Sequence, residues 1–88
     1  MAEVKLRAGA IEWREVEGEI VALDLDASEY VAVNRTGAAV WPLLAEGATR
    51  KQLAARLVSR YGIDRDSAER DLDRFLSALS ERGLLDAT

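Results

Sequence analysis

The sequence predicts an α+β domain in which a three-stranded antiparallel meander precedes three α-helices. Apolar residues recur with a period of two up to residue 33 and with a helical period from residue 36 onward. Two short turn sequences, at 17–18 and 26–29, divide the first part into three strands. Connections this short join antiparallel strands, because a parallel pair needs a crossover of a dozen or more residues. At 88 residues we expect one domain spanning 1–88, with its core at about 10–85.

The strands are predicted at about 11–16, 19–25 and 29–33. Glu17-Gly18 favours a tight hairpin turn, because glycine accepts the positive φ that such a turn needs. The segment 26–29, "DASE", predicts the second turn. In such a meander the second strand is central, so the third strand is an edge of the sheet.

The first helix is predicted to begin close to the end of the third strand and to end at Gly47. Asn34 and Thr36 are both suitable N-caps. Pro42 removes one backbone donor and crowds the preceding turn, so we expect this helix to be kinked or short.

Two further helices follow, at about 50–60 and from about 65 to 82. Thr49 and Gln52 have the spacing of a capping box, and either Asp64 or Asp66 is a suitable cap for the third helix. Gly83 is predicted as the residue that ends it. Each helix has one apolar stripe, so the helices are expected to pack on one face of the sheet, with Trp13, Trp41 and Phe75 as the large core residues.

Composition excludes several classes of site. The chain has no cysteine and no histidine, which leaves out disulfides, thiolate-bound zinc and the commonest general base. We expect no metal or cofactor. The net charge is −4 and no apolar run reaches the roughly 18–20 residues that span a bilayer. The N-terminus lacks the apolar centre of a secretion signal, so we expect a cytoplasmic protein without membrane contact.

No set of residues predicts catalysis. The serines have no histidine to activate them, and Asp71 and Asp73 point to different sides of a helix. Asp66, Glu69 and Asp73 can share a face, but a solvated surface with arginine partners is the favoured interpretation. We therefore expect a protein that is not an enzyme.

Four ordered segments, at 13–25, 30–41, 53–64 and 71–85, resemble the PqqD-like proteins, also called recognition elements for ribosomally made and post-translationally modified peptides. The more specific positions are Asn34, Thr36-Gly37, Tyr61-Gly62 and Gly83-Leu84-Leu85. The resemblance covers about residues 10–85, and Pro42 departs from it. It implies a winged-helix-like fold that holds the leader segment of a precursor peptide for a modifying enzyme.

The resemblance also implies a setting. Stand-alone members of this size are similar to those of pyrroloquinoline-quinone and lasso-peptide pathways. In lasso pathways the family works beside a leader peptidase and an ATP-dependent macrolactam synthetase, which are the expected partners together with the precursor peptide. A chaperone role in quinone-cofactor biosynthesis is the alternative within the family.

The family's binding mode is β-augmentation, in which the peptide adds as a fourth strand to the third strand of the sheet. Val31 and Val33, with Leu25 behind them, are predicted as the floor of the groove, and the third helix as its wall. Plain core packing or a solvated surface is the competing interpretation of these residues. Tyr30 either faces the core or acts as a lid. The predicted peptide-binding residues are Leu25, Tyr30, Val31, Ala32, Val33, Asp71, Arg74, Phe75 and Ala78.

Two other functions are compatible with the pattern. A winged-helix DNA-binding regulator would read bases with the third helix, but segment 65–82 carries five acids against four arginines, which disfavours a place between phosphates. An adaptor that pairs the third strand with a second copy of itself would elute as a dimer without peptide.

Overall fold

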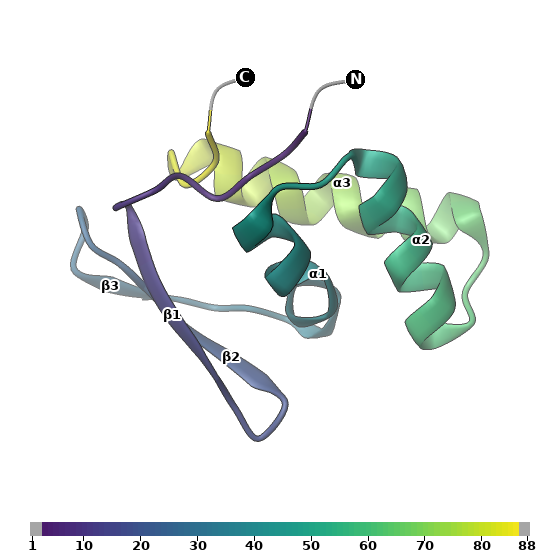
Figure 1. Cartoon of the computed structure of the whole chain (residues 1–88), viewed down its shortest axis with the longest axis horizontal. Coiled ribbons are helices and arrows are strands. Elements are labelled where there is room, and N and C mark those ends of the chain that lie inside the picture. The colour runs from purple at the N-terminus through teal and green to yellow at the C-terminus, as the bar shows by residue number, and fades with distance from the viewer. Residues whose placement is uncertain (1–2, 87–88) are drawn as a thin grey trace.

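The computed structural model describes residues 3–86, which form one sheet covered by helices on one side (Figure 1). The strands are antiparallel and lie in the order β1-β2-β3. The α+β class and the order of elements are confirmed. The predicted span 1–88 includes residues 1–2 and 87–88, which lie outside the described residues. The elements are β1 (Ile11–Val16), β2 (Glu19–Asp24), β3 (Glu29–Val31), α1 (Arg35–Glu46), α2 (Arg50–Tyr61) and α3 (Arg65–Glu81).

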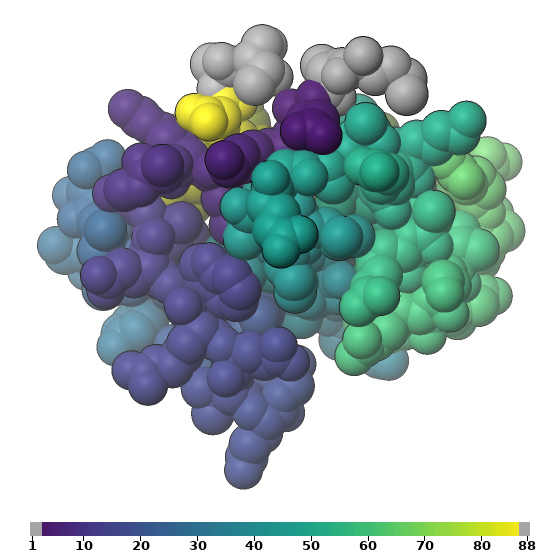
Figure 2. Space-filling model, viewed as in Figure 1, coloured from purple at the N-terminus to yellow at the C-terminus, as the bar shows by residue number. Residues whose placement is uncertain are grey.

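Both predicted turns form. Glu17 and Gly18 have φ of 52° and 81°, the pair of positive values that matches the twist of a two-residue hairpin. In the β2–β3 turn the Oδ1 atom of Asp24 accepts hydrogen bonds from the backbone N–H groups of Asp26 and Ala27, each at 3.2 Å. The Asp24 side chain thus supplies the local backbone partner expected of a turn aspartate. In Figure 2 the tip of the β1–β2 hairpin projects beyond the surface that the helices form.

The register assigns each side chain of the sheet to one of two faces. Trp13, Ala22 and Val31 form a cross-strand row that faces the helices. The neighbouring row faces away from the helices and consists of Glu12, Leu23 and Tyr30. The face that carries Ile20, Ala22 and Asp24 is therefore the buried one.

The junction between β3 and α1 differs from the prediction. β3 ends at Val31 rather than at residue 33, and α1 begins at Arg35. Asn34 is the cap, because its Oδ1 atom accepts the backbone N–H of Gly37 at 2.9 Å. The chain must leave the sheet at Ala32 to reach this geometry. Of the two predicted effects of Pro42, a kinked or a short helix, the second does not occur, since α1 runs for 12 residues with the exposed Pro42 inside it and ends at Gly47 as predicted.

Three aromatic rings connect the sheet to two helices. Trp41 is fully buried, and its ring meets that of Trp13 at 6.2 Å and that of Phe75 at 6.3 Å between centroids. The interplanar angles of 71° and 61° are edge-to-face arrangements, which aromatic quadrupoles favour. The three rings hold α1 and α3 at fixed positions against the inner face of the sheet.

The helix ends follow local sequence signals. The predicted capping box of Thr49 and Gln52 forms, and Asp64 rather than Asp66 caps α3. At the C-terminus of α3, Gly83 has φ of 71° and donates to the carbonyl of Ser80, while Leu84 donates to that of Leu79. This is a Schellman motif, and it turns Leu84 into the core.

An N-terminal arm, residues 3–10, was not predicted. Val4 pairs with Ala48 and Leu6 with Leu85 in isolated antiparallel bridges, and Leu6 is only 5% exposed. The core therefore extends before residue 10. The segment gives no local signal because its apolar residues are too few to show a period.

Candidate functional site

The outer edge of β3 carries no paired strand. The sheet order places β3 at the edge, and within residues 3–86 its only strand partner is β2. The N-terminal arm bridges to Ala48 and Leu85 instead. An edge without a strand partner is where another extended chain can add to a sheet.

A groove of about 320 Å³ lies between the end of β3, the start of α1 and the side of α3. Six of the nine predicted residues line it, namely Val31, Ala32, Asp71, Arg74, Phe75 and Ala78. The other lining residues are Asn34, Thr36, Leu79 and Arg82. The groove thus joins a strand edge, the feature that β-augmentation needs, to a helical wall.

The apolar part of the α3 wall depends on a close approach between α1 and α3. The Phe75 ring is 7% exposed and lies against Gly37. A Cβ atom built on Gly37 would come within 2.5 Å of Phe75 Cζ and 2.9 Å of Val33 Cγ1, which is closer than atoms pack. Glycine is needed here for space, and it lets the Phe75 side chain form part of the groove.

Charged side chains lie along the α3 wall and at the end of the groove. Asp71 is half-buried and Arg74 exposed, and among residues 3–86 neither forms an ion pair. At the end of α3, Arg82 Nη2 lies 3.6 Å from Asp24 Oδ2 and 4.0 Å from Glu29 Oε2. Arg82 thereby connects the wall of the groove to the turn that leads into β3.

Three predicted residues lie outside this groove. Leu25 follows β2 and is 38% exposed, so the prediction that it lies behind the floor is wrong. Tyr30 is 76% exposed on the sheet face away from the helices, and it does not face the core. Val33 lies beyond the end of β3 and lines a different cavity, between the β1–β2 hairpin and helices α1 and α2. Two features account for these differences. β3 ends earlier than predicted, and the pairing of the strands fixes which face of the sheet each side chain lies on.

Four lining residues were not predicted as site residues. The sequence marks Asn34 and Thr36 as helix caps and as positions of the family resemblance, and it gives no reason to place either of them, or Leu79, in the site. Arg82 was missed although it continues the helical spacing of Asp71, Arg74 and Ala78. Extending that stripe by one turn would have found it.

The described chain contains neither a membrane-spanning helix nor a cluster of metal ligands. In residues 3–86 no helix is long and apolar enough to cross a membrane. Over the same residues, no three acidic side chains converge in a way that could hold a metal ion.

The chain is similar to known proteins in family and in fold. The family model for Coenzyme PQQ synthesis protein D (PqqD) matches residues 19–85. The solved structure "TbiB1 in Complex with the TbiA(beta) Leader Peptide" superposes with a TM-score of 0.84 at 31% identity, covering 96% of both chains. "Lasso peptide synthetase B1 complexed with the leader peptide" gives a TM-score of 0.80 at 31% identity, covering 98% of this chain and 100% of that one.

No curated protein sequence matches the chain. The family match extends from β2 to the Schellman end of α3, and so includes both walls of the groove. It confirms the family that the sequence resembles. The chain belongs to the PqqD family.

Proposed function

We propose that the protein binds the leader segment of a ribosomally synthesised precursor peptide by strand addition to β3, and that it does so without catalysing a reaction. The observation that carries this function is the combination of an unpaired β3 edge with a groove of about 320 Å³ along α3. Both solved neighbours are complexes with leader peptides, which supports the same assignment.

Affinity and specificity come from different parts of the groove. Backbone hydrogen bonds at the β3 edge contribute about 0.5–1.5 kcal/mol each and depend little on the peptide sequence. Specificity comes from an apolar leader side chain that enters beside Phe75 and from charged leader groups that meet Asp71 and Arg74. Binding mainly through the backbone suits a protein that holds a flexible leader while another protein acts on the remainder of the peptide.

The pathway is proposed from the neighbours. Both are complexes with a leader peptide, and one is described as a lasso peptide synthetase, so we assign this protein to a lasso-peptide pathway, with a leader peptidase and a macrolactam synthetase as partners. The family model is described by coenzyme PQQ synthesis, and this favours a chaperone of quinone-cofactor biosynthesis as the second candidate. Calorimetry with synthetic leaders from both kinds of precursor separates the two, because only the cognate leader binds tightly.

Strand addition has its own test. A set of synthetic leaders, each N-methylated at one backbone amide, is titrated into the protein by calorimetry. Every second position within the bound stretch loses affinity by about two- to tenfold, because only alternate amides of an added strand point to β3. Equal losses at consecutive positions, or none, would show that the peptide binds in another way. Absence of binding by the unmodified leaders contradicts the function itself.

A further inference from the structure

A second cavity, of about 620 Å³, lies between the β1–β2 hairpin and helices α1 and α2. Arginine side chains from both helices line it, namely Arg35, Arg56 and Arg60. Among residues 3–86 none of these three arginines forms an ion pair. Guanidinium groups that gather in a cavity without carboxylate partners are suited to binding an anionic group.

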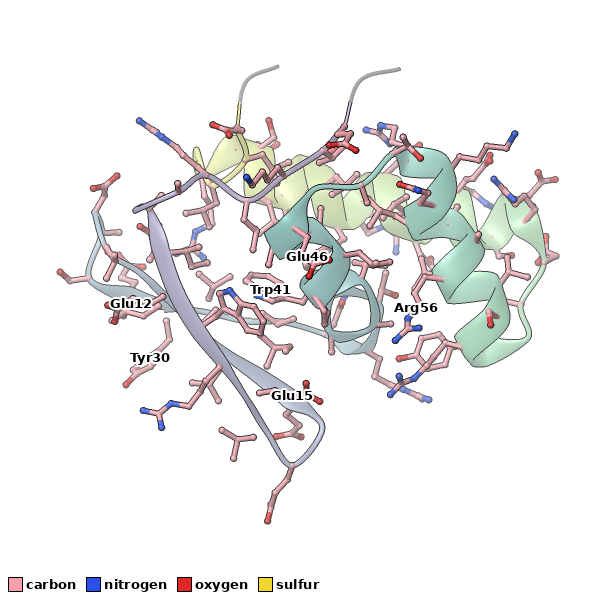
Figure 3. All side chains as sticks on the ribbon, viewed as in Figure 1. Glu12, Glu15, Tyr30, Trp41, Glu46 and Arg56 are labelled. Carbon is pink, nitrogen blue, oxygen red and sulfur yellow. The ribbon has the colours of Figure 1, made fainter. Side chains whose placement is uncertain are left out.

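The acidic side chains on the hairpin side of this cavity do not balance the arginines. Glu15 pairs with the buried Ile20, so it lies on the face of the sheet that the helices cover. Glu19 also lines the cavity but pairs with Val16, in a row that faces away from the helices. Figure 3 shows Glu15 on the hairpin and Arg56 on α2, on opposite sides of the cavity. Three positive charges therefore stand against at most two negative ones.

Contacts with the fold hold two of the arginines in place. The Cζ atom of Arg35 lies 5.1 Å from the centroid of the Tyr61 ring, and the Tyr61 hydroxyl donates to the Arg35 carbonyl at 2.9 Å. Arg56 Nε donates to the carbonyl of Ala39 at 3.4 Å, which leaves the other N–H groups of its guanidinium for a ligand. Side chains that are already ordered lose less conformational entropy when a ligand binds.

Helix dipoles distinguish Arg35 from Arg60. Arg60 lies in the last turn of α2, where the dipole favours a positive charge, so the fold itself explains this residue. Arg35 is the first residue of α1, where the dipole disfavours a positive charge, and the first turn of that helix contains no acid. The charge of Arg35 is therefore unfavourable in the free protein, and a bound anion removes this cost.

Continuity with the groove identifies the ligand. Asn34 lines both the groove and this cavity, so a peptide that leaves the groove at the end of β3 can continue into the cavity. The sheet is antiparallel, and an added strand that continues this order runs opposite to β3. Residues just before the added stretch therefore pass Asn34. On the basis of the proposed function, we propose that Arg35 and Arg56 bind acidic side chains of the precursor peptide immediately before the stretch that adds to β3.

Calorimetry with a charge series of peptides tests this assignment on the wild-type protein. The probe is a synthetic leader that wild type binds, with its added stretch identified by the N-methylation series. It is made with a pair of glutamates just before that stretch, with a pair of glutamines there, or with the glutamates just after it. We expect the first form to bind about two- to tenfold more tightly than the second. The third form should show no such gain, because its glutamates lie at the other end of β3.

Substitutions in the protein test the same contact from the other side. Arg35→Gln/Arg56→Gln should abolish the advantage of the first peptide and leave binding of the glutamine form within about twofold of wild type. The control Lys51→Gln/Arg60→Gln removes the same net charge and should keep the advantage. Circular dichroism melts establish that both variants fold, and the peptide series on wild type does not depend on them.

Three results would overturn the proposal. The first is equal binding of the glutamate and glutamine forms by wild type. The second is a loss of the advantage in the control variant as complete as in Arg35→Gln/Arg56→Gln, which would indicate a general charge effect. The third is displacement of the leader by mixed-sequence DNA from wild type but not from Arg35→Gln/Arg56→Gln, which would make the cavity a phosphate site. Failure of the proposed function is a different result, namely that wild type binds no leader in any form.

Discussion

The guanidinium Nη2 of Arg82 lies 3.6 Å from the Oδ2 of Asp24, a carboxylate that is 5% exposed. The two residues are far apart in sequence, one at the end of α3 and the other at the end of β2. Because Oδ1 of the same carboxylate accepts two backbone N–H groups of the β2–β3 turn, Asp24 joins that turn to the groove wall.

Replacing this carboxylate should destabilise the fold. Asp24→Ala leaves the N–H groups of Asp26 and Ala27 without their acceptor and Arg82 without its buried partner. We expect the free energy of unfolding to fall by about 1–3 kcal/mol. Urea denaturation followed by circular dichroism measures it. Asp26→Ala, in the same turn but exposed, is the control and should change stability by no more than about 0.5 kcal/mol. Equal effects of the two variants would contradict the role given to Asp24.

The contact between Gly37 and Phe75 predicts an overpacked variant. Gly37→Ala forces its new Cβ against the Phe75 ring and the Val33 side chain, at a cost of about 1–3 kcal/mol. Phe75→Leu makes room, so Gly37→Ala should cost less in that background. A double-mutant cycle from denaturation midpoints measures the coupling. Additive effects would mean that the contact with Val33, and not the contact with Phe75, sets the cost.

Charge on the α3 wall predicts a change in peptide affinity. Arg74→Glu should weaken leader binding by about two- to tenfold, the range expected for a partly exposed charge that loses an attractive partner. Arg60→Glu alters net charge equally but lies outside the groove. Calorimetry at two salt concentrations should show a loss for Arg74→Glu alone, and a smaller one at high salt. Matching losses in both variants would point to long-range charge instead of a groove contact.

The N-cap of α3 predicts a pH dependence. Hydrogen bonds from Ser67 lower the pKa of Asp64 below its ordinary value of 3.8. A group with a lowered folded-state pKa stabilises the fold above its unfolded pKa, and this stabilisation disappears as the pH falls through the folded pKa.

Wild type should therefore melt at a higher temperature than Asp64→Asn at neutral pH, and the difference should shrink as the pH falls below 3.8. Thermal melts followed by circular dichroism across this range measure it. Asp66→Asn, in the first turn but not at the cap, is the matched control and should show a smaller difference. A gap between wild type and Asp64→Asn that persists in acid would exclude the ionised cap as its cause.

Local sequence signals were sufficient for the order of elements and for most helix ends. Thr49, Gln52 and Gly83 act within a few residues of themselves, so their roles can be predicted from spacing. Most of the α3 side of the groove could likewise be predicted from helical periodicity together with the family resemblance.

The faces of the sheet could not be predicted in the same way. One side of β2 carries the more apolar residues Val21, Leu23 and Leu25. The other side carries Ile20, Ala22 and Asp24, yet this second side is the buried one. Arg82 pairs with the buried Asp24 carboxylate and makes its burial possible. Because Arg82 lies nearly sixty positions later in the chain, no local sequence pattern contains this pairing. Tyr30 faces away from the helices for the same reason, because pairing with β2 fixes which side chains of β3 lie on each face of the sheet.

The N-terminal arm has a practical consequence for protein engineering. Asp86 donates its backbone N–H to the carbonyl of Lys5 at 2.8 Å, so the polypeptide enters and leaves the domain at neighbouring points. Such a unit can be spliced into a surface loop of an unrelated carrier with short connectors, since the carrier's own ends need not be pulled apart. A chimera of this kind would give the carrier a site for recruiting tagged substrates.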